Sequence, residues 1–215
     1  EAFPETSFNI DRNSLEQYLR FGYIQAPNTI YEGIYKLPPG NLIEFSKNDI
    51  REGLIPKSSK YWSLELITKQ QESDLFLGSD MQAIDQLENV LKNSISGQLL
   101  ADVPVGAFLS GGIDSSTVVS IMQNQSSNPI NTFTIGFEEF EYDESKAARI
   151  IASYLGTNHK ELFVSPDDAL SIIPKLSEVY DEPFADVSQI PTFLISKFAS
   201  ENVKVCLSGD GGDEL

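Results

Sequence analysis

The chain has 215 residues, and 40% of its side chains are hydrophobic, enough to bury a sizeable core in one large domain or in one domain and a piece of another. Its 15 basic and 32 acidic residues give a net charge of −17. This balance argues against a nucleic-acid partner, because affinity for nucleic acid comes mainly from lysine and arginine neutralising phosphates. No apolar run approaches the length of about 18 residues that a transmembrane helix needs, so no membrane partner is predicted. A single cysteine excludes an intrachain disulfide, which indicates a cytoplasmic protein.

The first third of the chain gives short, interrupted signals. The spacing of apolar residues predicts a helix over 14–21, and two strand-like runs lie around 37–40, where a Pro-Gly pair marks a turn. The composition becomes polar over 69–80, which indicates a linker. The sequence therefore predicts one region at 1–75 and another at 76–215.

The second region alternates regularly between helical and strand-like patterns. The predicted elements, in chain order, are a helix over 81–99, a strand over 103–109, a helix over 115–125, a strand over 132–137, a helix over 144–155, a strand over 160–164, helices over 166–179 and 191–200, and a strand over 203–207. Alternation of this kind implies parallel strands joined by right-handed crossovers, which is an α/β fold with a doubly wound parallel sheet. Ligands of such sheets bind beyond the carboxyl ends of the strands.

The glycine-rich segment 110–116, with the sequence SGGIDSS, directly follows the first of these strands. Its two glycines let the backbone turn sharply before a helix begins near Asp114, so backbone N–H groups and a partial positive charge face outward. Ser110, Ser115 and Ser116 add hydroxyl donors, and the segment therefore predicts an anion site. Asp114 is suited to holding a Mg²⁺ that bridges phosphates. The alternative is a turn in which Asp114 or Ser115 merely caps the helix.

A second glycine-rich segment, 208–214 with the sequence SGDGGDE, follows the last predicted strand and so falls at the same edge of the sheet. The alternative interpretation of its acids is a solvated acidic turn. The sequence contains neither the GxxxxGK[S/T] phosphate loop nor a GxGxxG segment after a strand. P-loop kinases and GTPases are therefore excluded.

The single cysteine and the single histidine each allow more than one role. Cys206 lies in an apolar run, which favours a buried core residue over a nucleophile. His159 has the chemistry for general acid–base catalysis, but a histidine at the surface or at a helix end is the alternative.

Together these motifs resemble a known family. Residues 110–115 match the SGGxDS pyrophosphate loop of the ATP pyrophosphatases, and the neighbouring motifs narrow the resemblance to the glutamine-dependent asparagine synthetases. The further matches are colinear: VPVG at 103–106, TFTIGF at 132–137, YDE at 142–144, GTNH at 156–159, DEPFADVS at 181–188 and LSGDGGDE at 207–214. The resemblance implies a Rossmann-like sheet of the ATP-pyrophosphatase (adenine nucleotide alpha hydrolase) type, with ATP and Mg²⁺ as cofactors.

The resemblance also implies roles for individual residues. Nucleotide contacts are expected at Leu109, Ser110, Gly111, Gly112, Asp114, Ser115, Ser116, Ile135, Ser208 and Gly209. Asp114 and Asp213 are expected to carry Mg²⁺. Asp210 stands where some relatives have glutamate, a residue proposed to take a proton from attacking ammonia. Asp186 and Ser188 are expected to frame the acceptor amino acid.

The N-terminal region carries a weaker resemblance. YLRFGY at 18–23 and KLPPGN at 36–41 are similar to the family's junction between its glutaminase domain and its synthetase. Region 1–75 is therefore expected to be a short remnant of a glutaminase domain with a linker, and 76–215 the N-terminal portion of the synthetase domain. Position 1 is glutamate, whereas the family's glutaminase nucleophile is an N-terminal cysteine, and the family's pyrophosphate-binding lysine is expected beyond residue 215. We expect a piece of a longer, homodimeric enzyme.

The activity that the resemblance implies is ATP-dependent amide synthesis. Aspartate is activated as an acyl-adenylate with release of pyrophosphate, and ammonia from glutamine then gives asparagine. The expected partners are these small molecules. One alternative is a relative that amidates another carboxylate, as in cell-surface sugar amidation or lactam closure. The other is a nucleotide-binding module without turnover.

Overall fold

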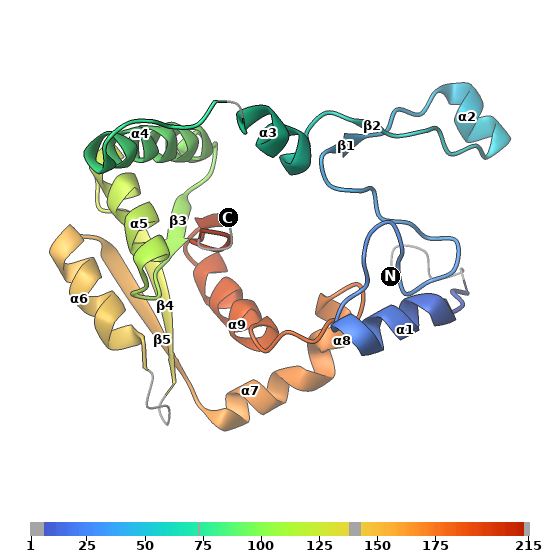
Figure 1. Ribbon diagram of the computed structural model, residues 1–215. Coiled ribbons are helices and arrows are strands. Elements are labelled where there is room, and N and C mark those ends of the chain that lie inside the picture. The colour runs from blue at the N-terminus through green and yellow to red at the C-terminus, as the bar shows by residue number, and fades with distance from the viewer. Residues whose placement is uncertain (1–6, 73, 138–142, 213–215) are drawn as a thin grey trace. The chain divides into compact units, whose positions relative to one another are not determined.

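The computed structural model describes residues 7–72, 74–137 and 143–212 (Figure 1). The chain divides into two compact units. The first comprises Glu1–Leu77 with Leu176–Asp186, and the second comprises Gly78–Lys175 with Val187–Leu215. A segment from late in the chain therefore folds with the N-terminal residues.

The second unit is built on a four-stranded sheet. Its strands are β3 (Val105–Phe108), β4 (Asn131–Phe137), β5 (Asn158–Val164) and β6 (Val205–Leu207). Their order is β5-β4-β3-β6, and every neighbouring pair is parallel. The predicted doubly wound parallel sheet is confirmed. The strand order reverses between β3 and β6, which makes their shared carboxyl edge the expected place for a ligand.

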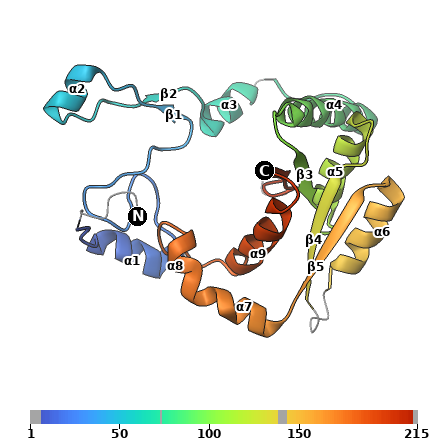
Figure 2. The ribbon, with the colours of Figure 1, turned by 180° about the vertical axis from the view of Figure 1, so that it is seen from behind.

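Helices cover both faces of this sheet (Figures 1 and 2). On one face lie α4 (Asp80–Leu99), α5 (Ile113–Gln125) and α6 (Ser145–Leu155), and on the other lies α9 (Gln189–Ser200). Side chains alternate along β3 as the strand period requires: Ala107 and Leu109 belong to the core under α5, whereas Phe108 packs with the core under α9. Burying a large apolar side chain contributes about 1.5–3 kcal/mol, so these two cores fix the sheet beneath the glycine-rich segments.

Sequence signals explain where the helices of this unit begin and end. Ser79 and Gln82 form a capping box at the start of α4. Gly156 ends α6 in the left-handed conformation, with φ 71°.

The first unit contains short elements, and its buried apolar side chains are Ile24 and Ile30 in the described chain. The elements are α1 (Arg12–Phe21), β1 (Asn41–Leu42), α2 (Lys47–Glu52), β2 (Ser59–Lys60), α3 (Leu64–Gln71) and α8 (Leu176–Val179). The helix predicted over 14–21 is confirmed as α1, and Asp11 caps it by accepting the Asn13 N–H. The strands β1 and β2 pair antiparallel.

Three sequence predictions need correction. Of the two strand-like runs predicted around 37–40, only the one after the turn forms a strand in the described chain, β1, and its partner is the distant β2. Consecutive prolines remove N–H donors at the turn. The predicted linker over 69–80 begins inside α3. The helix predicted over 166–179 is interrupted: α7 (Pro166–Ile172) passes into a 3₁₀ turn, Ile173–Lys175, because Pro174 cannot continue the α-helical hydrogen bonds.

Candidate functional site

The two glycine-rich segments meet at the carboxyl edge of the sheet, between the neighbouring strands β3 and β6. Gly209 approaches α5 so closely that a Cβ atom there would lie 2.6 Å from Ser115 N and 2.9 Å from the Asp114 carbonyl carbon. A residue with a side chain does not fit without moving the backbone. The prediction that both segments fall on one edge is confirmed.

The hydroxyl of Ser115 organises the first segment. Its Oγ accepts the Ser110 N–H at 3.2 Å, lies 2.9 Å from Ser110 Oγ and donates to the Gly112 carbonyl at 3.3 Å. Ser110 Oγ also accepts the Gly112 N–H at 3.2 Å. Because Ser115 is only 8% exposed, the bonds made by its hydroxyl are partly shielded from water. The segment is therefore held in shape by its own side chains.

The helix α5 begins at this segment without a side-chain cap. Its N-cap residue is Gly112, with φ −71° and ψ 166°, and this residue makes no side-chain cap hydrogen bond to the first-turn N–H groups. The alternative in which Asp114 or Ser115 caps the helix is therefore wrong. The positive end of the helix dipole and the first-turn N–H groups are directed at the segment, as in an anion site.

The first turn of α6 packs against Gly111 of the first segment. Gly111 has φ 90°, in the left-handed region, and a Cβ atom there would lie 2.8 Å from Ala147 Cβ and 2.9 Å from Ala148 N. Sequence reasoning did not find this contact, because small residues on a helix have no local signal for what they touch.

The carboxylate of Asp114 faces the second segment. A Cβ atom built on Gly212 would lie 3.0 Å from Asp114 Oδ1. Asp213, the other predicted Mg²⁺ ligand, lies outside the described residues. Within 7–72, 74–137 and 143–212, no three histidine, cysteine or acidic residues gather closely enough to hold a metal.

The second segment is held mainly by its backbone. The Gly212 N–H donates to the Gly209 carbonyl at 3.2 Å, and the Asp210 N–H donates to Ser208 Oγ at 3.4 Å. The side chains of Ser208 and Asp210 are exposed. The carboxylate of Asp210 is therefore accessible to solvent, and its catalytic role remains a prediction.

Leu109 and Ile135, predicted to flank the nucleotide, lie on adjacent strands but on opposite faces of the sheet. The Leu109 side chain is 1% exposed in the core under α5, whereas Ile135 packs with the core under α9. The Leu109 carbonyl also accepts a hydrogen bond from the Thr134 hydroxyl. Any contact of Leu109 with a nucleotide therefore falls to its backbone, and the roles of both residues remain predictions.

The predicted acceptor residues fall in different compact units. Asp186 ends the segment that folds with the first unit, whereas Ser188 caps the start of α9 in the second. Both residues are exposed. Their role toward an acceptor remains a prediction.

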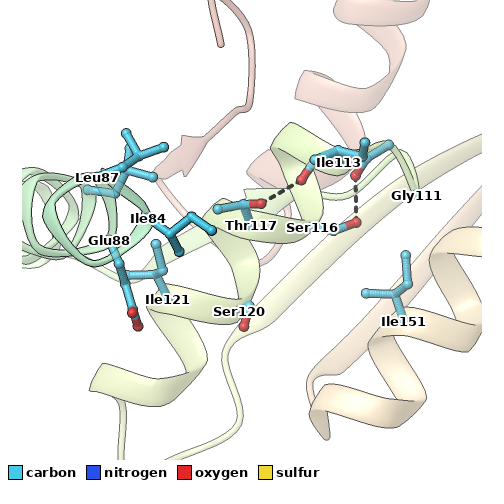
Figure 3. Close-up of a pocket in the computed structure, with 12 residues that line it drawn as sticks. Ile84, Leu87, Glu88, Gly111, Ile113, Ser116, Thr117, Ser120, Ile121 and Ile151 are labelled. Atoms are coloured by element: carbon cyan, nitrogen blue, oxygen red, sulfur yellow. Dashed lines mark hydrogen bonds between the residues drawn. The ribbon is translucent and has the colours of Figure 1, made fainter. Parts of the chain in front are cut away.

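Sequence reasoning missed an apolar groove beside the first segment (Figure 3). It has a volume of about 620 Å³ and runs from Gly111 and Gly112 past Ile151 to Ile84 and Leu87. The helical spacing of Ile84 and Leu87 predicted that they share one face of the helix over 81–99, and in the structure these side chains are 57% and 59% exposed. Spacing shows which residues share a face of a helix, and it does not show whether that face is covered.

Cys206 and His159 are not part of either segment. Burial raises the pKa of the Cys206 thiol to about 11, as expected for a core cysteine and unfavourable for a nucleophile. His159 lies on β5 with its side chain 10% exposed, so the prediction of a surface or helix-end histidine is wrong. No helix in the described residues is long and apolar enough to cross a bilayer.

These features define an α/β protein with a glycine-rich segment before an uncapped helix at the switch point of a parallel sheet, where an acidic second segment adjoins it. The family model described as "Asparagine synthase" matches residues 86–215. The chain belongs to the asparagine synthase family. A second model, "Glutamine amidotransferase domain", matches residues 2–62.

Individual proteins agree with this assignment. The chain is 38% identical to "Putative asparagine synthetase [glutamine-hydrolyzing] 2" of Methanocaldococcus jannaschii, over 96% of the chain and 38% of that protein. It is 31% identical to "Asparagine synthetase [glutamine-hydrolyzing] 1" of Bacillus subtilis, over 98% of the chain and 31% of that protein. The chain thus spans about a third of the length of these relatives.

Among solved structures, the NH3-dependent NAD synthetase of Campylobacter jejuni is similar at 13% identity and a TM-score of 0.40. The match covers 57% of this chain and 54% of that one. This likeness is too weak to argue from.

Proposed function

We propose that the chain carries the ATP site of a glutamine-dependent ligase that activates aspartate as an acyl-adenylate and converts it with ammonia to asparagine. The observation that supports this most is the contact between the two glycine-rich segments at the switch point. An uncapped helix start and an acidic segment lie within van der Waals distance there. Family membership supports the same chemistry.

The first segment binds the pyrophosphate end of ATP. Its small residues leave backbone N–H groups accessible, and Ser110, Ser115 and Ser116 supply hydroxyls around the same turn. The network centred on Ser115 keeps these donors in place before ATP arrives, so little ordering is needed on binding.

The acidic residues control charge in the adenylation step. The acceptor carboxylate must approach the α-phosphate, and two anions do not come together without a cation. Asp114 and Asp213 would hold Mg²⁺, which supplies that positive charge. Asp210 takes a proton from the attacking ammonia, and Asp186 with Ser188 binds the acceptor amino acid.

The first test removes space from the anion site without disturbing the fold. In Gly112→Ala the new Cβ has Ser110 Oγ as its nearest neighbour, at 3.3 Å, and the φ of −71° suits alanine. Calorimetric titration of the full-length protein should show ATP and pyrophosphate binding weakened about tenfold, because the methyl group stands in the phosphate cradle. The matched control is Gly97→Ala, whose Cβ meets nothing within 4 Å. ATP binding that is equal in the two variants contradicts the assignment.

The second test concerns Mg²⁺. Asp114→Asn should weaken binding of ATP in the presence of Mg²⁺ and leave binding of ATP in EDTA unchanged, because the amide is a poorer ligand for a hard cation. The control is Asp167→Asn, which neutralises an acid in the first turn of α7. If both titrations of Asp114→Asn match wild type, Asp114 does not hold the metal.

A further inference from the structure

The segment Leu176–Asp186 is bonded to the N-terminal part of the first unit through one lysine and one glutamate. Lys36 Nζ forms an ion pair with Glu182 and donates to the Ile24 carbonyl at 2.7 Å. The other carboxylate oxygen of Glu182 accepts the Ile30 N–H at 3.3 Å. The Ala185 N–H donates to the Gly22 carbonyl at 2.6 Å. We call the Lys36–Glu182 pair with its backbone partners the clasp.

The clasp differs from an ordinary surface ion pair. The side chains of Lys36 and Glu182 are 33% and 21% exposed, and the pair lies against Ile24 and Ile30, which are 3% and 6% exposed. By contrast, the pair Lys69–Glu65 in the same unit is 63% and 72% exposed. An ion pair that also satisfies backbone groups in a part-buried place contributes more than a solvated one, and losing one partner leaves the other uncompensated.

The two ends of the clasp come from different family regions. Lys36 lies in the part that matches the glutamine amidotransferase model, and Glu182 lies in the part that matches the asparagine synthase model. Glu182 also stands in the DEPFADVS motif, shortly before Asp186 and Ser188. The motif that was predicted to bind the acceptor therefore uses its glutamate to hold the amidotransferase-like part of the chain.

We propose that the clasp positions the acceptor-binding stretch of the chain, so that affinity for the acceptor amino acid depends on a lysine of the amidotransferase-like region. Lys36 and Glu182 are positioning residues, since they act through the backbone that carries Asp186. This inference rests on the proposed function for its acceptor. The physical reason is pre-organisation: a stretch that is already fixed loses little freedom when the acceptor binds, whereas a released stretch must be ordered by the acceptor itself.

The test separates acceptor binding from the rest of catalysis. In the full-length protein, Lys36→Met should raise the KM for the acceptor about tenfold, while the KM for ATP stays within about twofold of wild type. Lys36→Arg keeps the charge and should restore the acceptor KM. The matched control, Lys69→Met, removes the same charge from the exposed pair and should change neither constant. If Lys36→Met does not fold, Glu182→Gln tests the same contact with nearly unchanged volume.

Amide hydrogen exchange supplies a readout that needs no activity. The N–H groups of Ala185 and Ile30 should exchange at least about tenfold faster in Lys36→Met than in wild type or Lys69→Met. An unchanged acceptor KM in an active Lys36→Met enzyme overturns the inference and leaves the proposed function intact. A wild-type protein that makes no pyrophosphate from ATP with any amino-acid acceptor overturns the proposed function. If the proposed function fails in this way, exchange can still test the clasp. Equal exchange rates at Ala185 and Ile30 in Lys36→Met and wild type would show that the ion pair does not hold this stretch.

Discussion

The two glycine-rich segments are alike in composition and differ in how they are held. The first contains a buried hydroxyl, Ser115, that bonds the segment to itself at both ends. The second, within its described residues 208–212, is bonded through its backbone N–H groups at 3.2 and 3.4 Å, and its side chains are exposed. Its position comes instead from the close contact of Gly209 with the start of α5.

This difference separates two ways of building a binding site. A segment that carries its own hydrogen bonds is pre-formed whatever its neighbour does. A segment held by contact takes its place only because the neighbour is already there. The first segment should therefore tolerate loss of the second better than the second tolerates any disturbance of the contact.

The strongest disturbance of the contact is Gly209→Ala. The new Cβ would lie 2.6 Å from Ser115 N, and because that atom belongs to the backbone the two segments must move apart. We expect a loss of about 1–3 kcal/mol in the free energy of unfolding, as for other overpacked sites. Affinity for ATP should fall roughly a hundredfold, because both segments are misplaced together.

Chemical denaturation and calorimetric titration measure these two effects. Gly97→Ala, in an open position of α4, is the control and should change neither. If Gly209→Ala binds ATP like wild type, the second segment does not contribute to the site.

A smaller effect is expected from Ser115→Ala, which removes the hydroxyl that holds the first segment. The Ser110 N–H then loses its acceptor in a largely buried place, and such a loss costs about 1–3 kcal/mol. Denaturant unfolding is the measurement. The comparison is Ser116→Ala, which removes one bond, to the Gly112 carbonyl at 2.6 Å, from a more exposed side chain. Equal losses in the two variants would show that Ser115 has no special part in shaping the segment.

Much of the second unit could be predicted from its sequence because the signals there are local. The strands β3, β4 and β5, and the helices α4, α5 and α6, each carry their own periodicity and end signals. The parallel sheet followed from their alternation. The prediction of one continuous helix over 166–179 was wrong, because Pro174 and the boundary between the two compact units both fall inside one apolar stretch.

The candidate site was predictable to the same extent. Both glycine-rich segments were found because each motif is contiguous in sequence. Two contacts between residues far apart in the chain were not found. The contact of Gly111 with Ala147 involves side chains without distinctive chemistry, and the pairing of Lys36 with Glu182 rests on a single charge pair. Leu109 and Ile135 were named from the resemblance, but their placement on opposite faces of the sheet was not predicted, because it depends on strand register.

The smallest expected effect is a dependence of stability on pH. It sharpens the comparison of the two glycine-rich segments, because the group expected to titrate lies outside both of them. In the described chain the ionisable side chains of the segments are the carboxylates Asp114 and Asp210. The chain's one histidine is His159 on β5. Its Nδ1 lies 2.9 Å from the Thr132 hydroxyl, and its buried Nε2 has no hydrogen-bond partner in the described residues.

Burial lowers the pKa of His159 below its ordinary value of 6.5, although Glu161, 3.4 Å away, opposes the shift and Arg149 adds to it. The unfolded chain therefore binds a proton at a higher pH than the folded chain does. It follows that this histidine leaves stability intact above pH 6.5 and reduces it as the pH falls through 6.5 toward the lowered folded-state value. We expect wild type to lose stability between about pH 7.5 and 5.5, and His159→Gln to show a flatter profile there.

The pKa of Glu161 is lowered, chiefly by its hydrogen bonds from Arg149, so its protonation belongs to more acidic conditions. Denaturant unfolding across this range gives the difference between the two profiles, at about 1.4 kcal/mol per pKa unit. Parallel profiles for the two proteins would show that His159 is equally easy to protonate in both states, and the pH response would then have to come from elsewhere in the chain.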